Sequence, residues 1–263
     1  MNKIIILLFG FMSFFLHASD NMSGKNNDYK NKNYRTNCIG YNDEADLLNS
    51  FVQYKIGSDY YLGVNGCPKD YEKAYEYFIK SAHQNNSNAQ VMISTFYLEG
   101  VVVKADKEKA IEWLIKSANQ NNTLAEYNLG MLYLEGEGAR KDSKEAYKWL
   151  IKAANKNDES AQYNLSLMYR NGDGVQVDKN KSIEWVRKAA ENGHIKAMYD
   201  LAILYLNGEG LKKNINNAKY WYLKSAKLGS SESAFNLGMI FVSEGKYEDA
   251  LQNLIYASDL GNK

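Results

Sequence analysis

Residues 161–193 read AQYNLSLMYRNGDGVQVDKNKSIEWVRKAAENG, and this stretch decides the fold because the chain repeats it. Its tryptophan, Trp185, recurs every 36 residues, and three other residue types keep the same period. A period in the thirties is typical of helical solenoids, in which each repeat is one helix-turn-helix unit. The four recurring sets are Trp113, Trp149, Trp185 and Trp221; Gly100, Gly136, Gly172 and Gly208; Ala89, Ala125, Ala161 and Ala197; and Tyr97, Tyr133, Tyr169 and Tyr205.

Each repeat contains two stretches with the apolar spacing of an α-helix. In one repeat, the spacing predicts a first helix over Ala125–Glu135, a turn at Gly136-Glu137-Gly138 and a second helix over Ser143–Asn155. Either Asp142 or Ser143 can cap the second helix, because a short side-chain oxygen accepts from the unpaired backbone N–H groups there. The predicted buried faces comprise Ala125, Leu129, Leu132 and Tyr133, then Ala146, Trp149, Leu150, Ala153 and Ala154.

Small residues recur where two helices of a repeat approach each other closely. Gly130 and Gly238 occupy this position, and Ser94, Ser166 and Ala202 occupy it in other repeats. Gly193 and Gly229 follow second helices, where a left-handed residue ends a helix well. We therefore expect close packing within each repeat and a left-handed residue after it.

The first and last units depart from the regular pattern. The first runs from about residue 46 to 86 and has an extra loop residue near Cys67-Pro68, and the last begins near Ser233 with a shorter loop. Terminal units of solenoids are commonly atypical. The sequence predicts an all-α fold over residues 43–263, a solenoid of about six helix-turn-helix repeats.

The N-terminal segment has the features of an export signal. Residues 1–18 combine Lys3, an apolar run and a small residue at Ala18, so we predict a cleaved signal peptide and a periplasmic or secreted protein. Residues 19–42 are polar and without periodicity, and we predict a flexible linker. Export to an oxidising compartment favours a disulfide between Cys38 and Cys67, the two cysteines of the chain; two unrelated thiols are the alternative.

The charge balance excludes some partners. Of the 32 basic residues one lies in residues 1–18, which contain no acid, so 31 basic and 31 acidic residues remain after cleavage. Nucleic acids and anionic membranes favour a basic surplus, so we expect neither as a partner. We also expect no integral membrane span after signal cleavage, since no later stretch is apolar enough.

The repeat resembles a known family, the Sel-1-like repeat, which is a relative of the tetratricopeptide repeat. The resemblance covers about residues 46–261. It implies a right-handed α-superhelix with a concave groove, and a function as an adaptor or assembly factor. Ser166 and Ser182 depart from the usual glycine-like residue and alanine, and Val101-Val102 replaces the Gly-x-Gly spacing in the second unit. The best-matching unit carries Ala161, Leu165, Tyr169, Gly172, Gly174, Val175, Asp178, Lys181, Trp185, Ala189, Ala190 and Gly193.

The sequence offers little for catalysis. After signal cleavage two histidines remain, His83 and His194, at different positions of their repeats, and we expect both at loops or helix ends. Glu112, Glu184 and Glu248 are expected on a solvated face. No phosphate-binding loop or nucleophile motif is present. We predict no enzyme activity, no cofactor and no metal site.

The first helices carry a recurring set that could form a binding groove. An aromatic residue is followed by an amide or carboxylate and then, one turn on, by an apolar residue. Rings and amides suit peptide recognition, but the same set could instead pack the scaffold. The candidate groove residues are Tyr127, Asn128, Met131, Tyr163, Asn164, Leu167, Tyr199, Asp200, Ile203, Phe235, Asn236 and Met239.

Three functions follow from these observations. The first is an exported, non-catalytic scaffold that binds a protein or peptide in its groove, as a monomer or in a hetero-complex. The second is a periplasmic immunity protein that neutralises a secreted bacterial toxin. The third is a cell-wall hydrolase, which the scarce histidines and missing nucleophile motifs disfavour.

Overall fold

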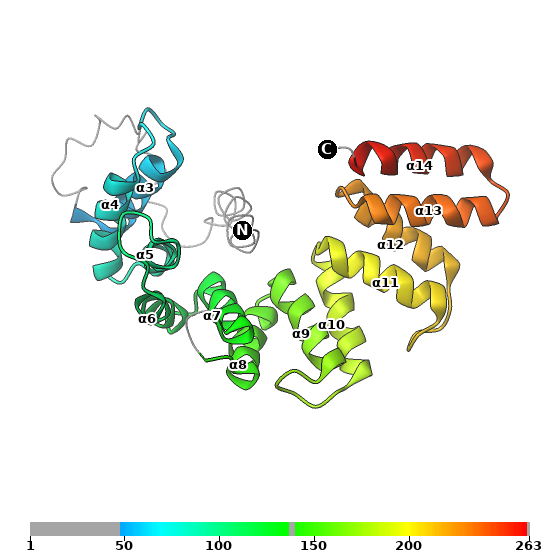
Figure 1. The fold of residues 1–263 in the computed structure, drawn as a ribbon, viewed down its shortest axis with the longest axis horizontal. Coiled ribbons are helices and arrows are strands. Elements are labelled where there is room, and N and C mark those ends of the chain that lie inside the picture. The colour runs from blue at the N-terminus through cyan, green and yellow to red at the C-terminus, as the bar shows by residue number, and fades with distance from the viewer. Residues whose placement is uncertain (1–47, 137–139, 262–263) are drawn as a thin grey trace, which may run out of the picture. The chain divides into compact units, whose positions relative to one another are not determined.

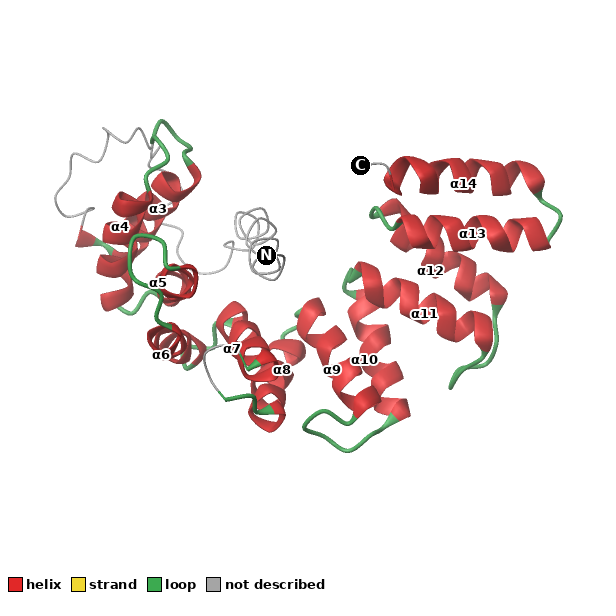
Figure 2. Cartoon of the chain, viewed as in Figure 1, coloured by secondary structure: helices red, strands yellow, loops and turns green. Residues whose placement is uncertain are grey.

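The computed structural model describes residues 48–136 and 140–261, and within them the chain forms twelve α-helices and no strand (Figure 2). The chain divides into two compact units, with unit 1 ending at Ala105 and unit 2 beginning at Asp106. The predicted all-α fold of helix-turn-helix repeats is confirmed.

Successive helices in each unit pack on one another, and α13 lies beside α14 at the C-terminal end of unit 2 (Figure 1). The six helix pairs follow one another along the chain at nearly constant spacing. Unit 1 contains α3 (Ser50–Leu62), α4 (Tyr71–His83) and α5 (Ser87–Glu99). Unit 2 contains α6 (Lys107–Ala118), α7 (Thr123–Glu135), α8 (Ser143–Asn155), α9 (Glu159–Asn171), α10 (Lys179–Glu191), α11 (Ile195–Asn207), α12 (Ile215–Lys227), α13 (Ser231–Ser243) and α14 (Tyr247–Gly261).

Polar side chains cap the start of the helices at the repeat period. Asp142, not Ser143, caps α8 by accepting from the backbone N–H groups of Lys144 and Glu145. Such caps satisfy donors that have no partner inside the helix. The other second helices in the series begin after Asp70, Asp106, Asp178 and Asn214, and first helices begin after Asn86, Asn122, Asp158, His194 and Ser230.

A left-handed residue follows each of the second helices from α4 to α12. Gly193 and Gly229 have φ of 107° and 101°, as the sequence predicted. Asparagine takes this conformation in the earlier repeats, at Asn85, Asn121 and Asn157, with φ between 62° and 67°. Asparagine tolerates the left-handed region better than most residues, so one backbone turn is built from two residue types.

The loop of the second repeat contains a strained residue. Val102 has φ of 68°, and the equivalent positions in later repeats are Gly174 and Gly210, with φ of 72° and 70°. A β-branched side chain is disfavoured in this region. The departure from the glycine pattern therefore changes the side chain while the backbone keeps its shape.

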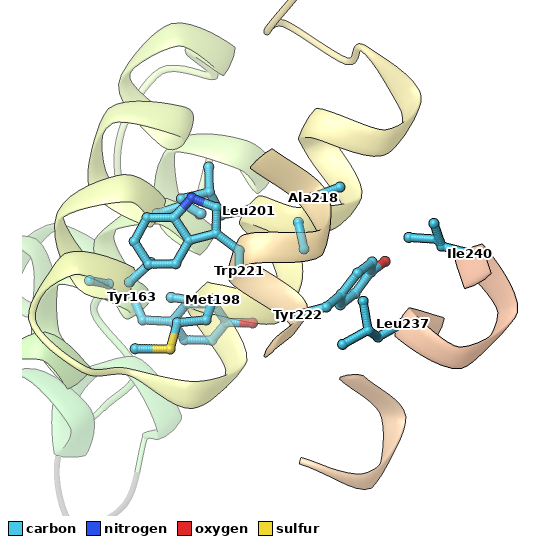
Figure 3. Packing of buried hydrophobic residues seen from close by; sticks show 13 residues of the cluster. Tyr163, Met198, Leu201, Ala218, Trp221, Tyr222, Leu237 and Ile240 are labelled. Atoms are coloured by element: carbon cyan, nitrogen blue, oxygen red, sulfur yellow. The ribbon is translucent and has the colours of Figure 1, made fainter. Parts of the chain in front are cut away.

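Close helix packing occurs where the sequence has its small residues. A Cβ on Gly130 would lie 2.5 Å from Cγ of Leu150, so α7 and α8 approach too closely for a larger residue. A core cluster in unit 2 continues from repeat to repeat, and Figure 3 shows Tyr163, Leu201, Trp221 and Leu237 in it. Each repeat thus completes the core of its neighbour.

Two predicted core residues, Tyr133 and Trp149, are less buried than expected, and Tyr133 packs against a core cluster while remaining partly exposed. Trp149 is only partly buried, whereas its equivalents Trp113, Trp185 and Trp221 are buried. The Nζ atom of Lys152 lies 3.9 Å from the centre of the Trp149 ring. Lys116 and Lys188 lie over the buried Trp113 and Trp185 at 4.1 and 4.3 Å, so this contact with a cation is common to the repeats and does not explain the difference.

The ends of the chain agree with the sequence where they are described. The loop between α13 and α14 is the short segment 244–246, as predicted. The predicted signal peptide (1–18), linker (19–42) and Cys38 lie outside the described residues, whereas Cys67 is buried in the loop after α3. The proposed disulfide stays a prediction. Among the described helices, none has the length and apolar character that a membrane span requires.

Candidate protein-binding surface

The aromatic and polar residues of the predicted groove pair with each other from one repeat to the next. The Tyr163 hydroxyl donates to Oδ2 of Asp200 at 2.9 Å. The same pairing joins Tyr199 to Asn236, whose Nδ2 donates to the hydroxyl oxygen at 3.3 Å, and Asn164 occupies the equivalent place beside the Tyr127 hydroxyl. We call each of these pairs a rung, because it joins the first helices of two successive repeats.

Burial favours the neutral form of two of these hydroxyl groups, those of Tyr163 and Tyr127. Burial, and then the Tyr163–Asp200 contact, raise the pKa of the Tyr163 hydroxyl well above its usual range. Burial likewise raises the pKa of Tyr127 to about 12. A neutral hydroxyl in a partly buried place contributes most when its hydrogen bond is made. The polar atoms of these rungs therefore serve the scaffold, which agrees with the packing interpretation of the set.

Asn128 departs from this pairing. Its side chain is buried, with 4 % of its surface exposed, and its Oδ1 atom has no hydrogen-bond partner among the described residues. An unsatisfied buried carbonyl costs stability, so the missing rung at Asn128 lowers the stability of the protein.

The predicted set becomes exposed at α13. Tyr163 is 7 % exposed, whereas its equivalent Phe235 is 51 % exposed. The apolar members Met131, Leu167 and Ile203 are partly buried, and Met239 is 46 % exposed. Positions that are buried or partly buried within the stack are thus exposed at its C-terminal end.

A depression between α9, α10 and α11 contains two of the predicted residues, Asp200 and Ile203. It has a volume of about 460 Å³. Ile183 and Val186 contribute apolar surface, and the lining also includes charged side chains of both signs. The full lining is Arg170, Lys179, Ser182, Ile183, Val186, Asp200, Ile203, Leu204, Glu209 and Gly210.

A second, more open depression of about 600 Å³ involves α11, α13 and α14. Tyr199, Phe235 and Asn236 of the predicted set line it, together with Glu232 and Leu254. Apart from Asp200, the charged residues of these depressions were not singled out from the sequence. Arg170 has leucine at the equivalent positions Leu134 and Leu206, so the 36-residue period could not find it, whereas acidic residues do recur at the position of Glu209.

A further polar pair joins the first helix of a repeat to the residue that follows its second helix. Nζ of Lys156 lies 2.8 Å from Oε1 of the buried Glu126, and the equivalent atoms of Asn192 and Gln162 lie 2.9 Å apart. A buried carboxylate is stable only when paired. The buried carboxylate is therefore structural, whereas Glu112, Glu184 and Glu248 are exposed, as predicted.

Both histidines of the described chain lie at helix ends, as predicted. His83 is the last residue of α4. His194 caps α11, since its Nδ1 accepts from the backbone N–H of Ala197 at 3.1 Å, and its ring stacks on Tyr163. Burial lowers the pKa of His194 to about 4, so the ring is neutral and able to accept. Among the described residues, no three His, Cys, Asp or Glu side chains gather as metal ligands.

The repeats match a family model described as the Sel1 repeat, over residues 50–86, 87–122, 123–158, 159–194 and 195–230. The chain belongs to the Sel1 repeat family. The matched segments begin at or next to the first residue of each first helix, so the family unit coincides with the structural one. The pair α13 and α14, with its short loop, lies outside these matches.

Two solved structures are similar over most of the chain. A Sel1 repeat protein from Oxalobacter formigenes has 29 % identity and a TM-score of 0.78, with 84 % of this chain and 91 % of that one covered. The protective antigen c5321 of uropathogenic Escherichia coli has 28 % identity and a TM-score of 0.77, with 82 % of this chain covered. This chain spans 47 % of that longer protein. Among curated proteins, none matches the chain by sequence.

Proposed function

We propose that the protein is an exported, non-catalytic scaffold that holds a segment of another protein against the first helices of unit 2. The observation that carries this proposal is the depression between α9, α10 and α11. Its apolar surface comes from residues such as Ile183, Val186 and Ile203, and charged side chains border it. Protein interfaces commonly combine an apolar centre with a polar rim.

The charges bordering the depression suggest the chemistry of the bound segment. Arg170 and Lys179 favour an acidic group, and Glu209 favours a basic group. The volume of about 460 Å³ is in the range of pockets that bind small ligands, so it can take an anchoring apolar side chain. The proposed ligand is therefore an apolar anchor flanked by charges of both signs.

A capture experiment with matched variants tests this proposal. The double variant Arg170→Glu with Lys179→Glu reverses the exposed basic residues of the depression, and Lys144→Glu with Lys227→Glu makes the same charge change elsewhere. We expect a partner captured by the wild type to be recovered at least tenfold less with the first variant and equally with the second. Unchanged recovery with the first variant, at an unchanged helical circular-dichroism signal, would show that the depression is not the binding surface.

Export is proposed from residues 1–18 and has its own test. Expression in a Gram-negative host and mass spectrometry of the purified chain should give a mature N-terminus at Ser19. Recovery of the intact N-terminus from the cytoplasm would contradict export and leave the binding proposal standing.

A further inference from the structure

The outer face of α14 includes a position that contacts the next repeat elsewhere in unit 2. Tyr147 of α8 is hydrogen bonded to Tyr169 of α9, with 2.8 Å between the hydroxyl oxygens. At the equivalent position of α12, Nζ of Lys219 lies 2.6 Å from Oε1 of Glu244. In α14 this position is Leu251, and 60 % of its surface is exposed.

The first helix of the same repeat adds two exposed apolar side chains. Phe235 and Met239 occupy the positions at which Tyr163 and Leu167 join the core of unit 2. Phenylalanine carries no hydroxyl, so this position does not require the polar partner that closes a rung. With Leu251 of α14, these exposed side chains form what we call the C-terminal face. The helices α13 and α14 that carry it lie at the end of unit 2 (Figure 1). No described residue covers it.

The charge around this face differs from that of the preceding second helix. Residues 228–261 contain five acidic residues, Glu232, Glu244, Glu248, Asp249 and Asp259, and one basic residue, Lys246. The helix α12 carries three lysines and no acid. Two C-terminal faces would therefore repel each other, and this disfavours a second copy of the chain as the occupant.

We propose that the C-terminal face, formed by Phe235, Met239 and Leu251, binds an amphipathic helix of a partner protein whose apolar stripe is flanked by lysine or arginine. Inside unit 2 the same positions receive the first helix of the following repeat, so the surface is shaped for a helix. Apolar residues at i, i+3, i+4 and i+7 would cover the exposed side chains, as in other helix-in-groove complexes. The basic flanks would meet Glu232 and Glu248.

A synthetic helix serves as the probe. Its sequence is that of α11, IKAMYDLAILYLN, with two lysines added at each end and a fluorescent label; a second peptide carries glutamates instead. Titration of the full-length protein by fluorescence anisotropy should give at least tenfold tighter binding of the lysine peptide, and weaker binding at high salt. Equal affinities for the two peptides, or no binding of the lysine peptide, would overturn the proposal.

Two variants assign the binding to this face. Leu251→Asp should weaken binding of the lysine peptide at least tenfold, and Leu223→Asp, at another exposed leucine on α12, should leave it unchanged. Equal effects would overturn the assignment. Analytical ultracentrifugation supplies the remaining test, since a wild-type dimer that Leu251→Asp dissociates would identify a second copy as the occupant and overturn the proposal.

Discussion

Asp158 gives a quantitative test of the capping interactions. Its side chain caps α9 by accepting from the backbone N–H of Ala161, while burial, and then Glu159, raise its pKa to about 6. Asn122 occupies the equivalent place one repeat earlier and makes the same hydrogen bond to Ala125. The variant Asp158→Asn therefore keeps the accepting oxygen and removes the buried charge.

The expected gain in stability follows from the pKa of Asp158. A shift from 3.8 to about 6 corresponds to at most about 3 kcal/mol of unfavourable free energy for the charged form. The negative charge also gains roughly 0.3–1 kcal/mol from the helix dipole, and partial exposure of the carboxylate lowers its cost further. We expect the free energy of unfolding to rise by about 1–2 kcal/mol at pH 7 to 8.

The sign of the pH dependence is defined. Between pH 3.8 and 6 the folded state binds more protons at Asp158 than the unfolded state does. The contribution of this carboxyl to the free energy of unfolding therefore falls as pH rises. The advantage of Asp158→Asn should be near zero at pH 4 and full above pH 6, as measured by urea denaturation. The reciprocal variant Asn122→Asp should be destabilised above pH 6. An advantage independent of pH, or a loss at pH 7, would refute the reasoning.

Three further predictions test other local features by urea denaturation. His194→Asn should make the free energy of unfolding less sensitive to acid. The pKa of His194, about 4, lies below that of the unfolded state, so stability contributed by the neutral ring is lost as pH falls from 6.5 to 4. An unchanged dependence of the free energy of unfolding on pH in that window would contradict this. Asn128→Leu should stabilise the protein by about 1 kcal/mol, because Oδ1 of Asn128 is unsatisfied. Asn164→Leu should destabilise it by about 1–2 kcal/mol, because this change breaks the rung with Tyr127. Equal changes in the free energy of unfolding would argue against the rung. Val102→Gly should stabilise by about 1 kcal/mol through relief of the left-handed strain, and a loss of stability would mean that the side chain packs usefully.

The fold could be predicted because every repeat buries the same face. Ala125, Ala161 and Ala197 are each fully buried, so the same packing requirement recurs in several repeats of the sequence. The caps could be predicted only in part. Asp142 and Ser143 are both good caps, and the backbone conformation, not the residue type, decides between them.

The candidate surface could be predicted less well. Tyr163 and Asp200 stand 37 residues apart, and sequence alone could not tell whether the aromatic set faced a partner or the next repeat. Arg170 was missed because leucine occupies its position in the neighbouring repeats, at Leu134 and Leu206. Periodicity reports what the repeats share, whereas a binding surface depends on where they differ.

The rungs make the length of this protein adjustable. Each one joins an aromatic ring to a polar side chain of the repeat that follows, so a duplicated segment 159–194 inserted before Ile195 would complete two rungs. The original Tyr163 would meet the copied Asn164, and the copied Tyr163 would meet Asp200. The chain could therefore gain a repeat by gene duplication without a new kind of contact having to evolve.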